Sequence, residues 1–277
     1  MTKANNISAD RQKNIDKNQN PIAIFDSGVG GLSIAKCIAE QLPSEHLIYF
    51  ADSLHAPYGD KPAEFIQQRV NHIAAQLIQQ NAKALVIACN TATVNAIDQL
   101  RKRIDIPVIG VEPAIKPASQ QTKTGKVGIL VTSATAKNQR FISLVNRFTS
   151  DIEVYIQPCP GLMNVVEQGM INSEHSKQLL LKYINPLLAK QVDTLVLGCT
   201  HYPFLTGQIR EIVNHKLNVM ETAEPVTREL LRQLTQHNLL SENTQQGEQQ
   251  FFSSLFSTEL ENTFSQLWQQ KVTIQTF

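Results

Sequence analysis

The stretches ALVIACNTAT (residues 84–93) and TLVLGCTHYP (residues 194–203) share one pattern, in which an apolar run leads into a cysteine followed by hydroxyl or amide side chains. Short apolar runs bounded by polar residues are typical of buried strands in a parallel sheet. In open α/β sheets, ligands bind at the carboxyl ends of the strands. The pattern therefore predicts an α/β fold in which Cys89 and Cys199 both lie at a ligand-binding edge.

A weak internal repeat surrounds these two stretches. PIAIFDSG (residues 21–28) and KVGILVTSA (residues 126–134) each run a strand into a polar turn. The strand-end residues Asp26 and Thr132 precede the two cysteines by 63 and 67 residues. The repeat predicts two similar α/β domains that face each other, although chance similarity between buried strands is an alternative explanation.

Short apolar runs alternate along the chain with longer segments of helical pattern, which is typical of a βαβ protein with a largely parallel sheet. The predicted strands span residues 21–25, 46–51, 84–88, 107–111, 126–131, 152–157 and 194–197, and the predicted helices span residues 32–42, 62–80 and 174–189. Within residues 62–80 the apolar side chains recur at helical spacing, and we assign that face to packing on the sheet. They are Phe65, Ile66, Val70, Ile73, Leu77 and Ile78.

The predicted domains are divided where proline, glycine and polar residues gather. The crossover between the domains lies within residues 112–125, and the return lies near residues 224–225. The glutamine-rich residues 241–250 are predicted to form a surface loop. The full division is a polar N-terminal tail of residues 1–20, a first α/β domain of residues 21–115 plus 226–277, and a second α/β domain of residues 116–225.

The composition is that of an ordinary globular protein, with 277 residues and a hydrophobic content of 42%. A formal net charge of +1 gives no electrostatic reason to expect nucleic acid or an anionic membrane as a partner. No apolar run approaches the ~20 residues that span a bilayer. Residues 1–20 lack the apolar centre of an export signal, so we expect a cytoplasmic protein whose four cysteines are free thiols.

The four cysteines differ in their sequence surroundings. Packing in the core explains Cys37, which lies in a helical pattern, and also Cys159. Cys89 and Cys199 instead each follow a strand and precede small polar residues. Backbone N–H groups at the start of a following helix would favour the thiolate, so these two cysteines are predicted to do chemistry.

The loop FDSGVGGLS (residues 25–33) carries Asp26 at the point where a strand turns into a helix. The alternative function of such a glycine loop is dinucleotide binding, with Asp52 near the position of a ribose-binding carboxylate. Ser33 stands in place of the third glycine, however, and a carboxylate at Asp26 would repel a pyrophosphate. An aspartate beside an ammonium group, or beside a thiol that exchanges a proton, is the better explanation.

Two further motifs contribute polar groups. His201 lies two residues past Cys199, where an imidazole can hold or donate the proton of the thiol. HAPYGDK (residues 55–61) forms a turn whose backbone N–H groups could bind a carboxylate, although a plain surface turn is the alternative. No motif for a metal site, a Walker loop or a pyridoxal phosphate lysine is visible, so no cofactor is predicted.

With DSGVGG, PYGDK, ACNTAT and GCTHYP in this order, the chain resembles the bacterial glutamate racemases of the aspartate/glutamate racemase superfamily over residues 21–228. The resemblance implies two α/β domains related by pseudo-two-fold symmetry, with the active site in the cleft between them. It also implies that Cys89 and Cys199 are the catalytic acid/bases, that Asp26 assists Cys89, and that His201 and Glu167 assist Cys199. The implied substrate-binding residues are Asp26, Ser27, Pro57, Tyr58, Gly59, Asn90, Thr91, Thr132, Thr135, Thr200 and His201.

The implied reaction is the cofactor-independent racemisation of L-glutamate to D-glutamate, which would supply D-glutamate for peptidoglycan. Racemisation must remove the α-proton from one face of the substrate and return a proton to the other, and two thiols on opposite faces can do this without moving. The resemblance leaves open a homodimer and activation by a peptidoglycan precursor. The alternatives are an aspartate racemase or another amino-acid racemase of the same superfamily, a thiol redox enzyme, and a two-domain solute-binding protein.

Overall fold

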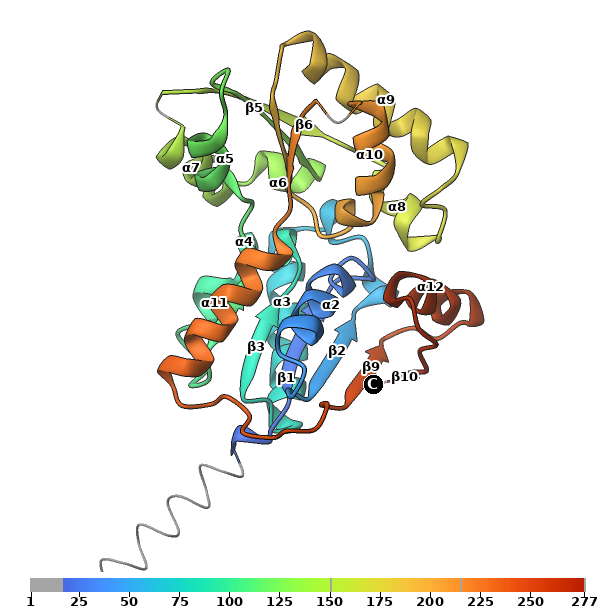
Figure 1. The fold of residues 1–277 in the computed structure, drawn as a ribbon. Helices are drawn as coiled ribbons and strands as arrows, with labels where there is room; N and C mark the ends of the chain where they lie inside the picture. Colours follow the sequence, from blue (N-terminus) through green and yellow to red (C-terminus); the bar gives the residue numbers. More distant parts are fainter. Residues whose placement is uncertain (1–16, 150, 215, 277) are drawn as a thin grey trace, which may run out of the picture.

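The computed structural model describes residues 17–149, 151–214 and 216–276, which fold into two parallel sheets placed one above the other (Figure 1). Residues 1–16, which belong to the predicted tail, lie outside the described part of the chain. Sheet A has the order β10 (Ile274–Thr276), β9 (Gln249–Ser253), β2 (Leu47–Ala51), β1 (Ile22–Asp26), β3 (Ala84–Ile87) and β4 (Val108–Gly110). Sheet B has the order β6 (Glu153–Pro158), β5 (Lys126–Val131), β7 (Thr194–Leu197) and β8 (Asn218–Met220).

The strand order of the two sheets confirms the internal repeat. β2, β1, β3 and β4 are neighbours in sheet A in the same sequence as β6, β5, β7 and β8 in sheet B, and every pair is parallel. All seven predicted strands are present, each within one residue of its predicted limits. The strand that ends at Asp26 therefore lies beside the strand that leads to Cys89, and β5 lies beside β7 in the same way.

The structure adds three strands that the sequence pattern does not predict. β8 has only three residues and lies at the edge of sheet B. β9 begins at Gln249, inside the segment predicted as a surface loop, and pairs with β2 on one side and β10 on the other. This pairing overrides the polar character of its first two residues, so the predicted loop is wrong for residues 249–250.

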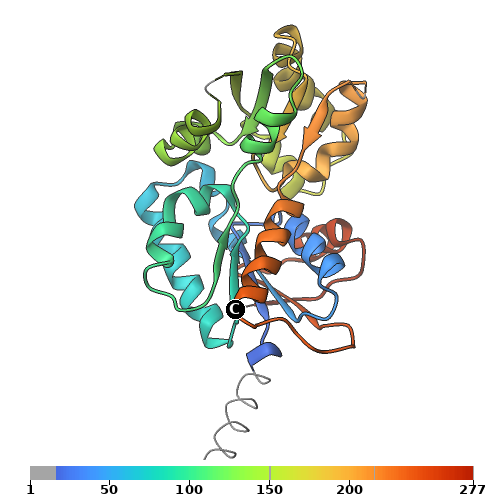
Figure 2. The same ribbon diagram turned by 60° about the vertical axis from the view of Figure 1, so that its left-hand side comes forward.

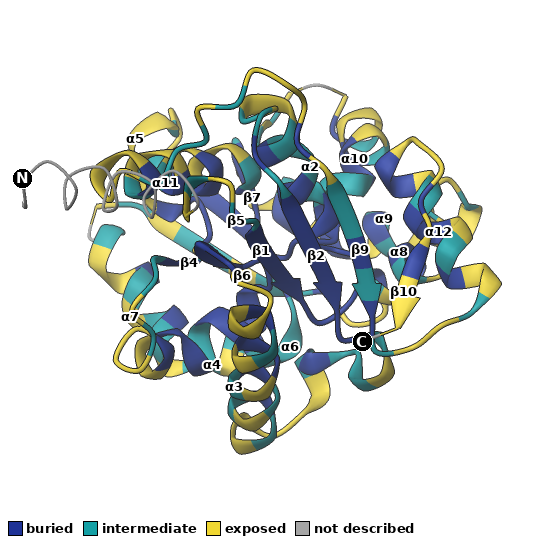
Figure 3. Cartoon of the chain, turned by 90° about the horizontal axis from the view of Figure 1, so that it is seen from below, coloured by how far each residue is buried: buried dark blue, intermediate teal, exposed yellow. Residues whose placement is uncertain are grey.

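Helices cover both faces of sheet A. α2 (Leu32–Gln41), α11 (Ala223–Gln236) and α12 (Thr258–Trp268) pack on one face, and α3 (Ala63–Gln79) and α4 (Asn90–Leu100) pack on the other. β1 shows why the arrangement is stable, because Ile22 and Ile24 face the first group while Ala23 and Phe25 face the second. Figure 3 shows the buried strands β1 and β2 between these layers.

Sheet B is covered in the same manner. α5 (Ile115–Gln121) and α7 (Gln139–Phe148) pack on one face, and α8 (Leu162–Glu167), α9 (Glu174–Ala189) and α10 (Thr206–Ile212) pack on the other. The predicted helices agree with α2, α3 and α9 to within one residue at each end. On α3, however, Phe65 is only half-buried and Ile78 is exposed, so these two do not belong to the packing face.

The chain crosses between the two halves twice. The first crossing, predicted within residues 112–125, contains the short helix α5, and the predicted return at residues 224–225 falls in the first turn of α11. α11 then packs along α2, beside sheet A (Figure 2). The domain limits proposed from the sequence stay a prediction. No helix in the described ranges is both long and apolar enough to cross a membrane.

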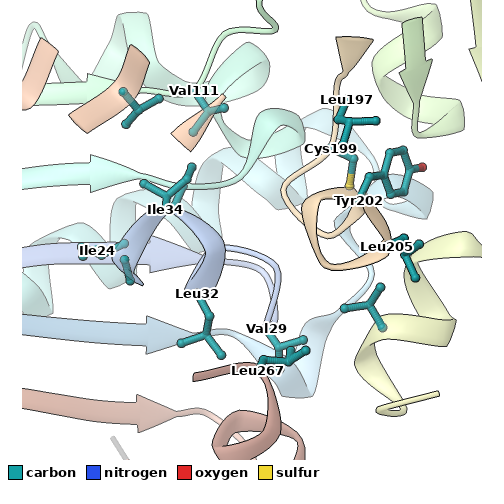
Figure 4. Close-up of a cluster of buried hydrophobic side chains, with 14 of the residues drawn as sticks. Ile24, Val29, Leu32, Ile34, Val111, Leu197, Cys199, Tyr202, Leu205 and Leu267 are labelled. Carbon is teal, nitrogen blue, oxygen red and sulfur yellow. The ribbon is translucent and has the colours of Figure 1, made fainter. Parts of the chain in front are cut away.

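One cluster of buried apolar side chains joins the two halves (Figure 4). Val29 and Leu32 contribute from the first half, and Leu197, Tyr202 and Leu205 contribute from the second. Close-packed side chains of this kind resist displacement, because every gap forfeits dispersion contacts. The cluster therefore fixes the distance between the loops that follow β1 and β7.

A buried ion pair lies at the opposite end of sheet A from the junction. Lys83 and Glu45 form a salt bridge with both side chains almost completely buried. Lys83 Nζ also donates to the carbonyl of Asn18 (2.6 Å), and Glu45 accepts from the N–H of Ser241 (2.9 Å). Burial lowers the pKa of Lys83, and the bond to Glu45 opposes that shift. The pair thus ties the start of β3 to two distant segments.

We expect Lys83→Met to lower the free energy of unfolding by about 3–5 kcal/mol, because it leaves the carboxylate of Glu45 buried without its cation. Urea denaturation followed by circular dichroism measures this change. Arg228→Met is the matched control, because the Arg228–Glu224 pair lies on the surface with side chains 71% and 68% exposed. The control is expected to cost less than about 0.5 kcal/mol, and equal losses in the two variants would contradict the assignment.

Candidate active site

The loops that follow the strands of the two sheets meet at the junction of the halves. Asp26 ends β1, Cys89 follows β3, Thr132 follows β5 and Cys199 follows β7. Most of the remaining predicted site residues lie in loops or first helical turns after these strands, but residues 57–59 follow β2 and Glu167 ends α8, which follows β6. The remaining residues are Ser27, Pro57, Tyr58, Gly59, Asn90, Thr91, Thr135, Glu167, Thr200 and His201.

Cys89 is buried at the start of α4, with its sulfur between a helix N-terminus and a serine–aspartate pair. Its Sγ accepts from the N–H of Ala92 (3.4 Å), as the N-cap of the helix. Ser27 Oγ lies 3.4 Å from the same sulfur and donates to Asp26 Oδ1 (3.1 Å). This chain of contacts offers the thiol a route for its proton to a carboxylate.

Burial governs the protonation of this pair. Burial, with a smaller contribution from the charge of Asp26, raises the pKa of Cys89 to about 12. Burial also raises the pKa of Asp26, although the cation at His201 opposes that shift. A raised pKa makes the carboxylate a stronger base, which suits it to take up a proton from its neighbours.

Cys199 has different partners. Its Sγ lies 3.6 Å from His201 Nδ1, and His201 Nε2 lies 2.6 Å from Glu167 Oε1. Burial lowers the pKa of His201, but its hydrogen bonds to Cys199 and Glu167 outweigh burial and hold the pKa well above its ordinary value. The imidazole is therefore a cation that can stabilise a thiolate beside it. Of the two thiols, one is paired with a buried carboxyl and the other with a buried imidazolium.

The glycine loop after β1 leaves room for groups from the other half. A Cβ at Gly28 would lie 1.9 Å from Glu167 Oε1, and a Cβ at Gly30 would lie 2.3 Å from His201 Nδ1. The N–H of Val29 donates to Glu167 Oε1 (3.0 Å). The glycines thus leave room for the carboxylate of Glu167 and the imidazole of His201. These two side chains fill the space above the loop, where a dinucleotide would place its pyrophosphate.

Further hydrogen bonds cross the junction. Thr200 Oγ1 donates to Asp26 Oδ2 (3.1 Å), and Ser33 Oγ donates to the carbonyl of Thr200 (3.0 Å). On the other side of the site, Thr91 Oγ1 lies 3.3 Å from Thr132 Oγ1 and 3.4 Å from Thr135 Oγ1. The halves are therefore closed on one another at both thiols.

Asn90 has polar atoms that no described group satisfies. Its side chain is 3% exposed, yet neither its amide oxygen nor its amide nitrogen has a hydrogen-bond partner in the described chain. An unpaired buried amide costs about 1–3 kcal/mol. Such a group at the edge of a site is suited to a polar ligand that supplies both an acceptor and a donor.

The sequence did not single out several groups that shape the site. Tyr49 Oη donates to the carbonyl of Gly28 (2.7 Å) and supports the glycine loop from below. Cys159 and Tyr202 line a cavity of about 70 Å³ that also touches Pro57 and Thr132. Tyr49 lies within an apolar strand, where a hydroxyl carries no distinctive pattern. Tyr202 belongs to the GCTHYP motif, but the sequence indicates no role for it, and Cys159 is predicted to pack in the core. In the parts of the chain that the structure describes, no cluster of histidine, cysteine, aspartate and glutamate is arranged as a metal site, and all four cysteines are free.

Comparison with known proteins places this chain in a family. The profile of the Asp/Glu/hydantoin racemases matches residues 29–235. A glutamate racemase of Ectopseudomonas mendocina is 47% identical over 228 residues, which cover 82% of this chain and 87% of the relative. A glutamate racemase of Pseudomonas aeruginosa is 44% identical over 248 residues, which cover 89% of this chain and 93% of the relative.

Solved structures agree with the sequence comparison. The glutamate racemase isoform RacE1 of Bacillus anthracis matches with a TM-score of 0.86 and 31% identity, over 94% of this chain and 98% of that one. The Escherichia coli glutamate racemase, solved in complex with L-glutamate and the activator UDP-MurNAc-ala, matches with a TM-score of 0.82 and 29% identity, over 93% and 98% of the two chains. The chain therefore belongs to the Asp/Glu/hydantoin racemase family, and within that family to the glutamate racemases.

Proposed function

We propose that the chain interconverts L- and D-glutamate by exchanging the α-proton with two thiols, Cys89 and Cys199, and that it needs no cofactor. The observation that carries the proposal is the placement of two buried thiols after the corresponding strands β3 and β7, each beside its own acid/base partner. A disulfide-forming redox enzyme has no use for two separate proton carriers of this kind. A solute-binding protein has no use for the thiols at all.

In the proposed reaction one cysteine is a thiolate while the other is a thiol. With L-glutamate, the Cα–H bond breaks and the proton joins Cys199, while the proton of Cys89 forms the new Cα–H bond on the opposite face. With D-glutamate, Cys89 accepts the proton and Cys199 delivers one. No electrons are exchanged with an outside group, so the two thiols are regenerated by moving protons alone.

The difficult step is the carbanion beside the substrate carboxylate. The predicted site contains no lysine or arginine, so its donors are neutral hydroxyl, amide and backbone groups, apart from the imidazolium of His201. Donors of this kind, aimed in a closed site from which water is excluded, stabilise developing charge without having to reorganise. We assign this role to Asn90, Thr91, Thr132 and Thr135. The loop of residues 57–59 would instead hold a substrate carboxylate through its backbone N–H groups, in the same way before and during proton transfer.

The partners of the two thiols have different proposed roles. Asp26, with Ser27, would pass the proton of Cys89, and its raised pKa suits a group that takes up a proton. His201, held by Glu167, would stabilise Cys199 as a thiolate. The product D-glutamate is a building block of peptidoglycan, and we propose that the enzyme supplies it in the cytoplasm.

We also propose that a peptidoglycan precursor of the type bound to the Escherichia coli relative acts on this enzyme as an activator. A groove of about 860 Å³ lies between α2, α5, α10 and α11, where the chain passes between the two halves. Lys36, Lys116 and Arg210 line it, together with acidic residues that include Glu40 and Glu221. A diphosphate is suited to such cations, and a ligand at a junction can bias the closure of the halves.

The first test uses single substitutions of the thiols. Purified protein with L-glutamate, and no added cofactor, should lose optical rotation, whereas L-aspartate should stay unchanged. Cys89→Ala and Cys199→Ala should each abolish racemisation, because each removes the proton carrier from one face. Each variant should still eliminate a good leaving group from a β-substituted analogue, with Cys199→Ala acting on the D-analogue and Cys89→Ala on the L-analogue.

Cys37→Ala, assayed without activator, is the control, because Cys37 lies on α2 and its substitution should leave this basal rate unchanged. A near-native rate of racemisation in either Cys89→Ala or Cys199→Ala would contradict the two-base mechanism. Racemisation of aspartate at the rate of glutamate would instead overturn the assignment of the substrate.

The second test concerns pH. His201→Asn removes the cation beside Cys199, so the thiolate becomes harder to form and more alkaline solution is needed to reach it. We expect kcat/KM at neutral pH to fall roughly 10²- to 10⁴-fold and to recover partly as the pH rises. The pH dependence of kcat/KM, measured with either enantiomer, checks this direction. A profile shifted to lower pH would contradict the role of the imidazolium.

The third test concerns the groove. We expect UDP-MurNAc-L-alanine to raise kcat/KM for glutamate. Lys116→Met or Arg210→Met should raise the concentration that gives half of this activation by about tenfold, the effect of one lost charge-assisted contact. Lys182→Met, on the exposed side of α9, is the control. Identical activation curves for all variants would place the activator elsewhere.

A further inference from the structure

A buried carboxylate with four donors lies behind the site, and the reaction described above gives it no task. Asp52 is fully buried and accepts from His55 Nδ1 (2.9 Å), Tyr58 Oη (2.7 Å), Arg69 Nε (2.9 Å) and Arg69 Nη2 (2.8 Å). Two of these partners lie in the loop after β2, and the third lies on α3. The side chain therefore joins a loop, a strand end and a helix at one point.

The backbone of Asp52 is tied to the catalytic strand. Its N–H donates to the carbonyl of Asp26 (2.9 Å), so Asp52 sits next to the carboxyl that serves Cys89. Beyond Asp52 the chain forms two short helical turns, η1 (Ser53–His55) and η2 (Tyr58–Asp60). Of residues 53–60 only Tyr58 is buried, so apolar packing alone gives this loop little hold on the protein.

The loop forms one wall of the site. The ring of Tyr58 packs against Phe25 with the centroids 6.2 Å apart. Gly59 faces the second half, where a Cβ placed on it would lie 3.5 Å from Thr132 Cβ. The height of the loop above sheet A therefore sets the space between Gly59 and Thr132, which both belong to the proposed substrate site.

The charge of Asp52 makes its bonds strong. Burial raises the pKa of Asp52, but its hydrogen bonds with Arg69, Tyr58 and His55 outweigh burial and lower the pKa overall. Burial and the neighbouring carboxylate raise the pKa of Tyr58, so its hydroxyl keeps its proton and acts as a donor. Hydrogen bonds to an ionised acceptor are about twice as strong as neutral ones.

We propose that Asp52 is a positioning residue for substrate binding. Through its hydrogen bond with Tyr58 it holds the loop of residues 57–59 in the position that binds substrate, while Arg69 neutralises the charge of Asp52. The inference rests on the proposed contact between this loop and the substrate. Asp52 itself touches neither substrate nor thiol. Because the loop contacts the substrate equally in the ground state and in the transition state, the effect belongs in KM and not in kcat.

The test is Asp52→Asn, which keeps the shape of the side chain and removes its charge. Its amide NH₂ would face the donors of Arg69 or Tyr58, so at least one bond is lost and the loop is released. We expect KM for glutamate to rise about 10- to 100-fold while kcat changes by less than about threefold. Tyr58→Phe, which removes only one hydroxyl, should raise KM by about tenfold or less.

Asp193→Asn is the matched control. Asp193 also accepts four hydrogen bonds, from Thr122, Thr194 and the N–H groups of Lys123 and Thr124, and its pKa is likewise lowered, by hydrogen bonds that outweigh its burial. It lies before β7, at the end of sheet B away from the thiols. Its substitution should reduce thermal stability and leave KM unchanged, which separates positioning from general stabilisation.

A double-mutant cycle tests the route through Tyr58. In the Asp52→Asn background, Tyr58→Phe should add little to KM, because the bond is already lost. Additive effects, or a fall in kcat with KM unchanged, would overturn the proposal. If Asp52→Asn fails to fold, Tyr58→Phe still gives the KM-against-kcat comparison with the wild type.

Hydrogen exchange of residues 53–61 tests separately whether Asp52 holds the loop and whether the loop binds substrate. In Asp52→Asn the amides of this segment should exchange faster while the rest of the protein is unchanged. Unchanged exchange would show that Asp52 does not hold the loop. Faster exchange with an unchanged KM would instead show that the loop does not bind substrate, and would overturn that part of the proposed function.

Discussion

The carboxylate oxygen Glu167 Oε1 joins the two halves beside Cys199. It accepts from the backbone of Val29 in the first half and lies 2.6 Å from His201 Nε2 in the second. Without this bridge the imidazole beside Cys199 would lose both its orientation and much of its charge. Gly28 is required because any side chain there would occupy the position of the oxygen.

The close contact between the two halves also explains why the site is buried. Hydrogen bonds between opposite halves, such as that from Thr200 to Asp26, satisfy polar groups that would otherwise be buried without a partner. Burial in turn raises the pKa values of Asp26 and Cys89, so closure of the halves tunes the groups that we propose to move protons. Asn90 is the exception, and its unmet bonds leave a place for a polar ligand.

The sequence predicted the local features and missed those that depend on distant contacts. Strands such as β5 and β7 were found because buried parallel strands are continuous apolar runs. β9 was missed because its polar start pairs with β2, which lies far away in the chain. In the site, the strand-end residues carried a visible motif, whereas the support from Tyr49 and the anchoring contacts of Asp52 arise only when the chain folds.

The unlike surroundings of the two thiols have a thermodynamic consequence. Mirror-image substrates have equal free energies, so the equilibrium constant is unity and kcat/KM must be identical in the two directions. A buried carboxyl at Cys89 and an imidazolium at Cys199 therefore cannot make the enzyme faster in one direction when substrate is scarce. In the proposed mechanism they instead divide the resting enzyme unequally between its two protonation forms. The enantiomer with the higher KM must then have a kcat that is higher by the same factor.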